Sequence, residues 1–421
     1  MASSVAPRDP TPPPTCGCWT TPRTPRCEHG RMTGAGTTGA RRRLLAAALG
    51  STCVALAACT TPSDVAPGPT PGNRSSTTPG SSSSDPTPDP TPSPDPAPAA
   101  PIRIALAGDI HFEGVLAGRL RDPSSALAPA AEALSAADLT IANLETSVGA
   151  GGRPEPGKRY TFSAGPEAFA ALAAAGVDVV SMANNHALDF GRGRLPSTLA
   201  AARRAGRAAA PLAVVGIGRD ADRAFAPALT DVGGTVVATL AASVADQDPT
   251  ADPTGDWAAT DNRAGIADAL DPARLLAGVR RAREDADVVV VYLHWGVQGE
   301  RCPSQDQRTL ARRLVGAGAD VVAGSHAHRL QGDGRLGDAY VAYGLGNFAW
   351  YSPGGSTTSR TGILYLTVRP RTGGSRPPHV VRAAWEPRRI GVDGLPATTG
   401  PKDGADFRAD RESLRSCAGL G

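Results

Sequence analysis

Short apolar runs and Ala-rich stretches alternate along the chain from Pro101 onward. The apolar runs predict strands at 102–106, 139–141, 177–180, 214–215, 235–237, 288–291, 321–322 and 340–342. The stretches between them predict helices near 124–137, 165–175, 193–206, 271–285 and 304–317, and several of these open with Ser, Asp or Pro. Continuous apolar strands that alternate with helices indicate buried sheets covered by helices, so the pattern predicts an α/β domain.

The alternation of predicted strands and helices ends after about Thr361. Residues 363–368 and 379–385 read as two further strands, and they predict a β-pair that ends the domain. We therefore expect a single domain over 101–395 and a looser C-terminal tail over 396–421.

The first part of the chain lacks the alternation. Residues 1–31 are rich in Pro, Thr, Arg and Cys and resemble neither a folded element nor a secretion signal. Met32 is a better candidate start, because a basic cluster at 41–43 and an apolar run at 44–58 follow it in the order found in signal peptides. That run is too short to span a bilayer comfortably.

The apolar run ends in Leu56-Ala57-Ala58-Cys59, which resembles the bacterial lipobox. Residues 1–59 are therefore predicted to be an N-terminal extension and lipoprotein signal peptide, with Cys59 as the lipidation site. The alternative is an ordinary small-residue cleavage site with an incidental cysteine. The adjacent arginines also resemble part of a twin-arginine signal, so the export route stays open. The lipobox predicts an exported lipoprotein, anchored at the outer face of the cytoplasmic membrane.

Residues 60–100 consist almost entirely of Thr, Pro, Ser, Asp and Ala. Such a segment buries too little apolar surface to offset the entropy of ordering it, and its prolines favour an extended spacer. We predict a disordered linker that holds the domain away from the membrane.

The cysteines are concentrated at the N-terminus. Of seven in the chain, only Cys302 and Cys417 follow the predicted lipidation site. Two thiols in an oxidising compartment favour a disulfide that ties the C-terminal tail to the domain, and a metal site is the less favoured alternative.

Overall charge excludes some partners. The chain has 43 basic and 40 acidic residues, a net charge of +3, and only 4% aromatic residues. No broad basic face and few stacking side chains are expected, so nucleic acid is not a predicted partner.

Metal-capable side chains follow the predicted strands. Open α/β sheets place their sites at the carboxyl ends of strands. The residues at these ends are Asp109, His111, Glu145, Asn185, His294, His326 and His328. Seven nitrogen and oxygen ligands suit two divalent cations that share a bridging carboxylate.

Histidine usage strengthens this prediction. The chain has seven histidines, and five of them, including His186, lie at predicted strand ends. The alternative is a hydrogen-bonded polar rim without a metal. Five imidazoles at the strand ends of a chain with so few histidines favour the metal site.

Six motifs occur in one order between Ile102 and Phe348. They are Gly108-Asp109-Ile110-His111, Asn143-Leu144-Glu145, Asn184-Asn185-His186 with Asp189, His294-Trp295-Gly296, Gly324-Ser325-His326-Ala327-His328 and Tyr343-Gly344-Leu345-Gly346-Asn347-Phe348. Together they resemble the CapA-like family of poly-γ-glutamate capsule biosynthesis proteins, which is similar to calcineurin-like metallophosphoesterases. The resemblance implies a four-layer α/β/β/α fold.

The resemblance also assigns roles. One metal would be held by Asp109, His111 and His328, and the other by Asn185, His294 and His326. Glu145 would bridge them where phosphoesterases generally use an Asp, and His186 would be the general acid for the leaving group. The implied cofactors are two divalent ions, Mn, Fe or Zn.

Three further residues have two interpretations each. Glu300 matches the family's segment that follows His294-Trp295-Gly296, and it either contacts substrate or is a helix-start carboxylate. Asp189 orients His186 in catalysis, or it caps the next helix. Asn347 contacts the site, or it belongs only to a tight turn.

Two functions fit these features. The first is a cell-surface metal-dependent hydrolase acting on a phosphoester or an anionic polymer in capsule synthesis, with capsule synthesis or export proteins as further partners. The second is a non-catalytic accessory protein that uses metal to hold a polyanionic polymer during export or anchoring. A solute-binding lipoprotein is a third, weaker alternative, because it would show two lobes and no metal cluster.

Overall fold

The computed structural model describes residues 100–254, 256–351, 357–370 and 379–421, which belong to one unit, Asp89–Gly421. The predicted signal peptide, Cys59 and nearly all of the predicted linker lie outside the described residues. Among the helices of the described part, none has both the length and the apolar character needed to cross a bilayer.

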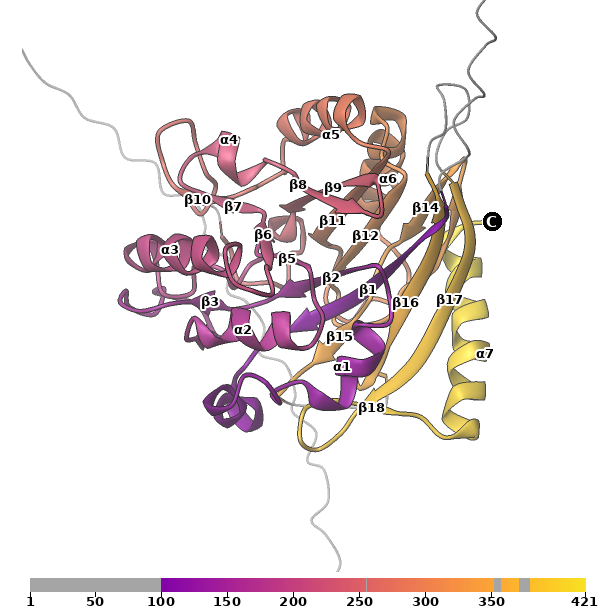
Figure 1. The fold of residues 1–421 in the computed structure, drawn as a ribbon, viewed down its shortest axis with the longest axis horizontal. Helices are drawn as coiled ribbons and strands as arrows, with labels where there is room; N and C mark the ends of the chain where they lie inside the picture. Colours follow the sequence, from indigo (N-terminus) through magenta and orange to yellow (C-terminus); the bar gives the residue numbers. More distant parts are fainter. Residues whose placement is uncertain (1–99, 255, 352–356, 371–378) are drawn as a thin grey trace, which may run out of the picture. The chain divides into compact units, whose positions relative to one another are not determined.

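Two mixed sheets form the centre of the described domain (Figure 1). The first sheet contains β1 (Ile102–Ile110), β2 (Leu139–Leu144), β5 (Val179–Ser181), β6 (Ala213–Val215), β15 (Asn347–Ala349), β16 (Arg360–Arg369), β17 (His379–Ile390) and β18 (Pro396–Thr398). The second contains β8 (Ala228–Val232), β9 (Thr235–Ser243), β11 (Val288–Trp295), β12 (Val321–His326), β13 (Asp333–Leu336) and β14 (Ala339–Ala342). Two small pairs join β3 (Ser147–Val148) to β4 (Ser163–Ala164) and β7 (Ile217–Gly218) to β10 (Gly265–Ile266).

Strand direction brings the carboxyl ends of several strands together. In the first sheet β1, β2, β5 and β6 are parallel neighbours, and β16 pairs antiparallel on the other side of β1. In the second sheet β9, β11, β12 and β14 are parallel neighbours. The predicted β-pair is present, since β16 and β17 pair antiparallel.

Helices cover the outer faces. They are η1 (Gly114–Arg121), α1 (Ala128–Leu134), α2 (Glu167–Ala174), η2 (Arg192–Arg194), α3 (Leu195–Ala205), α4 (Ala221–Ala224), η3 (Ala245–Gln247), α5 (Ala273–Asp285), α6 (Gln305–Ala317) and α7 (Pro401–Ala418). The start of α6 follows from its sequence, because Ser304 and Gln307 form a reciprocal capping box.

The side chains of β1 show the layer order. Ile104 and Leu106 belong to a core that includes residues of β9, β11 and β12, whereas Ala105 and Ala107 belong to a second core with residues of α1 and α2. This alternation is the period of two expected of a strand buried on both faces. Helices α5 and α6 pack on the second sheet (Figure 1). The order helix, sheet, sheet, helix confirms the predicted four-layer fold.

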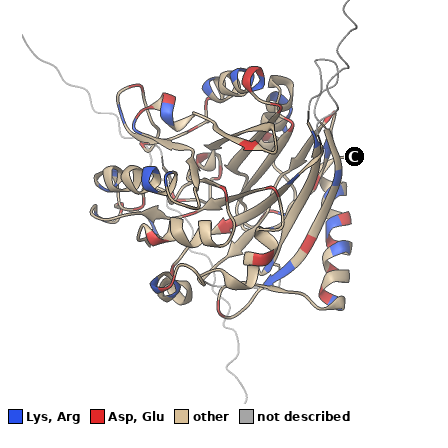
Figure 2. Cartoon of the chain, viewed as in Figure 1, with Lys and Arg blue, Asp and Glu red and all other residues tan. Residues whose placement is uncertain are grey.

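The C-terminal segment corrects the sequence prediction. Instead of a looser tail, 396–421 contains β18, which pairs with β17, and the eighteen-residue α7. Phe407, Leu414 and Ala418 are buried on one face of α7. Charged residues dominate the rest of this helix, as the blue and red segments of α7 show in Figure 2. A narrow apolar stripe in a charged segment is easily overlooked in a sequence.

A disulfide and ion pairs attach α7 to the domain. Cys302 and Cys417 are bonded, with their Cα atoms 5.6 Å apart. Arg411 makes a two-pronged contact with Asp333, with Nη2 2.7 Å from Oδ2 and 2.9 Å from Oδ1. The tail is therefore part of the folded domain.

We expect Cys417→Ser to lower the free energy of unfolding markedly. The disulfide closes a loop with a sequence separation of 115, and a loop of this order is worth roughly 4 to 5 kcal/mol in the chain-entropy model. Urea denaturation of the purified protein under oxidising conditions measures the change. Cys302→Ser should match it, and a reductant should lower wild-type stability but not that of either variant. Equal stability of wild type and variants would contradict the bond.

Candidate metal centre

The predicted ligands lie where strands of both sheets end. Asp109 is near the end of β1, Glu145 follows β2, Asn185 follows β5, His294 is in β11, His326 ends β12 and His328 lies two residues beyond it. Except for the partly exposed His328, these residues are buried. The site therefore lies at the junction of the two sheets, with ligands from each.

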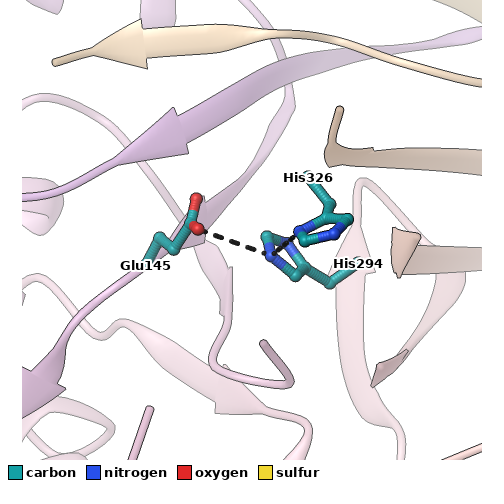
Figure 3. A group of neighbouring side chains, drawn as sticks. All are labelled: Glu145, His294 and His326. Carbon is teal, nitrogen blue, oxygen red and sulfur yellow. Dashed lines mark hydrogen bonds and ion pairs between the residues drawn. The ribbon is translucent and has the colours of Figure 1, made fainter. Parts of the chain in front are cut away.

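Glu145, His294 and His326 form a first ligand group (Figure 3). His294 Nε2 lies 3.5 Å from Glu145 Oε1 and 3.1 Å from His326 Nδ1. Asn185 Oδ1 adds a fourth polar atom, 2.8 Å from His294 Nε2. Four potential ligand atoms from four separate segments thus converge.

Asp248 determines which nitrogen of His326 faces this group. His326 Nε2 donates to Asp248 Oδ2 at 3.1 Å, so the lone pair of Nδ1 points toward His294. Burial opposes ionisation of Asp248, but the hydrogen bonds from His326 and from the backbone of Gln298 hold its pKa well below its ordinary value. Carboxylates that orient metal-binding histidines in this way are common around metal sites.

Asp109, Glu145 and His328 form a second ligand group. His328 Nδ1 lies 3.6 Å from Asp109 Oδ2 and 2.8 Å from Asn347 Oδ1. Burial opposes protonation of His328, but the charges of Glu145 and Asp109 raise its pKa to about 9. Glu145 belongs to both groups, which is the position that a bridging carboxylate requires.

Glu145 provides the test of whether cations fit. Its side chain is buried, and neither carboxylate oxygen has a hydrogen-bond partner among the residues that the structure describes. Burial, and then the charge of Asp109, raise the pKa of Glu145 well above its ordinary value. A buried carboxylate without partners is costly unless a cation compensates it. The two groups therefore fit divalent ions.

The histidines of the first group have the protonation state that metal ligands need. Burial lowers the pKa of His294 to about 3 and that of His326 to about 4. Both imidazoles are therefore neutral near neutral pH, and a neutral imidazole is the form that binds metal.

Backbone geometry at the end of β12 is also unusual. His326 has φ 98° and His328 has φ 54°, and they are the two non-glycine residues with positive φ in the described part of the chain. Such conformations cost of order 1–3 kcal/mol each and cluster at functional sites. Here they place two histidines, separated by one residue, in two different ligand groups.

His186 lies between the ligands and an open pocket. Its Nε2 is 3.7 Å from Glu145 Oε1, and its ring stacks on Phe162 with centroids 4.0 Å apart. Its Nδ1 lies 2.6 Å from Asp189 Oδ2. Of the two interpretations of Asp189, the structure therefore favours the orienting role, since neither η2 nor α3 has a side-chain cap.

The pocket has a volume of about 350 Å³. It is lined by Arg159, Tyr160, Phe162, Asn185, His186, Thr250, Asp252, Gln298, His328, Trp350 and Tyr351. The pocket therefore joins both ligand groups and His186 to solvent, with an aromatic wall and one guanidinium.

A known protein family matches most of the folded part of this chain. The family model described as "Bacterial capsule synthesis protein PGA_cap" matches residues 103–352, more than half of the chain. The chain belongs to this family. All residues of the two ligand groups, with His186 and Asp189, lie inside the matched PGA_cap region.

Two similar proteins have names that refer to capsule or polymer synthesis. "Capsule biosynthesis protein CapA" of Bacillus anthracis is 31% identical over 219 residues, which is 50% of this chain and 49% of that protein. A "Probable polyglutamine synthesis accessory protein" of Mycobacterium tuberculosis is 30% identical over 276 residues, 61% of this chain and 70% of that protein. The match thus spans about half of the Bacillus protein and more of the mycobacterial one.

Solved structures give weaker matches. A "novel phosphatase" of Mycoplasma pneumoniae aligns with 74% of this chain and 99% of its own, at 12% identity and a TM-score of 0.42. A 5'-nucleotidase of Candida albicans aligns with 76% of this chain and 58% of its own, at 9% identity and a TM-score of 0.37. These values are too low to transfer the activity of either protein.

Two predicted site residues lie apart from the ligand groups of this PGA_cap domain. His111 is buried, but its Nδ1 lies 3.0 Å from the backbone N of Glu113 and its Nε2 3.2 Å from that of Tyr351. Its role as a metal ligand stays a prediction. Glu300 is exposed, does not line the pocket and precedes α6, which begins at Gln305. The helix-start interpretation does not fit that placement, and a contact of Glu300 with substrate stays a prediction.

Three contacts at the site involve residues that sequence reasoning missed. Lys158, Phe162 and Asp248 touch His186, Asp189 or His326 directly. Each lies in an irregular segment outside the predicted helices and strands. A lysine in a Gly- and Pro-rich segment and an aspartate in a polar one carry no periodic signal. The contact of Asn347 with His328, by contrast, agrees with one of the two interpretations of Asn347.

We expect Asp248→Asn to weaken metal binding by about 10 to 100-fold, because the amide orients His326 less firmly than the carboxylate. Competition with a chelator measures the affinity. Asp252→Asn is the matched control, since Asp252 lies on the same segment but binds Arg159. Equal affinities of the two variants would contradict the role of Asp248.

Proposed function

We propose that this chain is a cell-surface, metal-dependent hydrolase of capsule synthesis, acting on a phosphoester or on an anionic polymer. The proposal rests on the placement of His186. It is oriented by a buried carboxylate, faces the shared Glu145 and lines the pocket. A site that only bound metal would not need an oriented proton donor beside its ligands.

The ligand groups define where the ions would bind. Asn185, His294 and His326 would hold one, Asp109 and His328 the other, with Glu145 shared and His111 as a further predicted ligand. Bound divalent ions, Mn, Fe or Zn, would polarise the substrate and neutralise its negative charge.

His186 would transfer the proton to the leaving group. Burial and the charge of Lys158 lower the pKa of His186 well below its ordinary value. An anionic substrate in the pocket would act in the opposite direction, because a nearby negative charge favours the imidazolium form. Asp189 accepts from Nδ1, so the proton to be delivered would reside on Nε2, which is the nitrogen nearer the ligand groups.

We further propose that the protein acts outside the cell, anchored through a lipid on Cys59, with polymer synthesis or export proteins as partners. The lipobox and the spacer at 60–100 support this location. The disulfide between Cys302 and Cys417 supports it as well, because such bonds persist in oxidising compartments.

The test is metal content and turnover of the purified full-length chain, assayed with aryl phosphate monoesters and diesters and with poly-γ-glutamate. About two divalent ions per chain and turnover that Asp109→Ala abolishes would support the proposal. Bound metal without turnover of any of these substrates would contradict it and favour the accessory function, which the name of the mycobacterial relative also suggests. A chain that binds no metal would refute both.

A further inference from the structure

Lys158 is a buried lysine beside the site. It lies between β3 and β4, and 2% of its side chain is exposed. Its Nζ is 2.6 Å from Asp189 Oδ1 and donates to the backbone carbonyl of Asn185. It also lies 4.6 Å from the ring centroid of Trp257. Lysines are almost never buried unless they are paired, and the partner that allows the burial of Lys158 is Asp189.

Lysine is rare in this chain. Of its 43 basic residues, only Lys158 and Lys402 are lysines, and all others are arginines. Lys402 is exposed on α7. An ammonium is a compact point charge on a flexible stem, whereas a guanidinium is a broad planar fork. The space between Asp189 and Asn185 therefore holds the smaller of the two cationic groups.

Asp189 connects Lys158 to His186. One carboxylate oxygen faces Lys158, and the other lies 2.6 Å from both His186 Nδ1 and the backbone N of Phe162. Three groups thus hold the carboxylate, which is buried. Burial still raises the pKa of Asp189 to about 7, and Lys158 opposes this effect. Lys158 therefore favours the charged carboxylate that holds the imidazole.

The same ammonium group also holds the backbone next to the imidazole. Asn185 supplies a potential ligand atom from its side chain and a carbonyl to Lys158, and His186 is the next residue. Lys158 is not among the residues that line the pocket. Any effect on the reaction must therefore pass through Asp189 and Asn185.

We propose that Lys158 is a positioning residue that orients His186 toward the leaving group through Asp189 and aligns it with the ligand Asn185. The inference rests on the proposed hydrolase function. A purely structural ion pair would stabilise the fold but would not affect proton transfer selectively.

The experiment compares Lys158→Met, Lys158→Arg and the control Lys402→Met in the full-length protein, with metal content measured for each. Turnover is measured with two phosphodiesters, one with an alkoxide leaving group and one with a dinitrophenolate, which departs without protonation. Lys158→Met should slow the alkyl ester at least about 10-fold more than the dinitrophenyl ester, because general-acid catalysis contributes about 10² to 10⁴-fold only where the leaving group needs a proton. Lys158→Arg should recover part of this loss, and Lys402→Met should change neither rate.

A second readout does not depend on turnover. In proton NMR spectra of protein with ¹⁵N-labelled histidine, the Nδ1 proton of His186, assigned by its loss in His186→Ala, should shift in Lys158→Met and not in Lys402→Met. Equal loss for both esters, or an unchanged His186 signal, would overturn the positioning role. If the wild type turned over neither ester, the assays with phosphate monoesters and poly-γ-glutamate would decide the hydrolase proposal separately, and the NMR comparison would still decide whether Lys158 positions His186.

Discussion

Glu145→Gln should make the metal-free protein more stable and should abolish the stabilisation that metal confers. The carboxylate is buried and shared by both ligand groups, and within the described part of the chain it has no hydrogen-bond partner. Without metal, its charge is a cost to the folded state that the neutral amide removes. With metal, the same charge would be a ligand shared by both groups, so its removal should prevent tight binding of both ions.

The effect on the metal-free protein should depend on pH in a defined direction. The pKa of Glu145 is raised well above the ordinary value of 4.5 in the folded state. Below pH 4.5 the Glu145 carboxyl is protonated in both the folded and the unfolded state, so it does not lower the free energy of unfolding. As pH rises, the unfolded chain releases its proton first, so the folded wild type loses about 1.4 kcal/mol for each pH unit until its own pKa is reached. The advantage of Glu145→Gln should therefore grow with pH from about 4.5 upward.

Thermal denaturation in a chelator between mildly acid and neutral pH measures this difference, and the same series with added divalent metal measures the loss of binding. Glu132→Gln is the matched control, because Glu132 is exposed on α1. It should alter neither series. A Glu145→Gln protein that is less stable than wild type in the chelator at neutral pH would show that the carboxylate has a compensating partner.

His186→Ala should reduce turnover of poor leaving groups by about 10² to 10⁴-fold, the usual contribution of a general acid, while metal content stays near that of wild type. The fold should tolerate the change, because Asp189 keeps its ion pair with Lys158 and its hydrogen bond from the backbone of Phe162. Steady-state kinetics and metal analysis of the same preparation measure the two quantities.

His379→Ala is the control for this substitution, since His379 is a histidine at the start of β17 and outside the ligand groups. It should leave both turnover and metal content unchanged. If His186→Ala kept wild-type turnover, another group would have to supply the proton. If it lost metal together with activity, His186 would act on the ligands instead of the leaving group.

Much of the site could be predicted before the structure was known, because parallel strands end at a common edge. Asp109, Glu145, His294 and His326 each follow or end an apolar run, and the structure brings them together. The predictions were weaker for residues that neither end an apolar run nor directly follow one. Glu300 follows a strand by several residues, and its loop directs it to solvent.

The sequence by itself determined the main strands and helices of 101–395 and the types of side chain at the strand ends, because apolar periodicity reports which residues of each element are buried. Only the tertiary structure decided that Glu145 belongs to two ligand groups and that α7 packs on the domain. It also decided which loop residues, Lys158 and Asp248, meet the histidines. These contacts join segments far apart in the chain, and no local pattern records which distant segment a loop will touch.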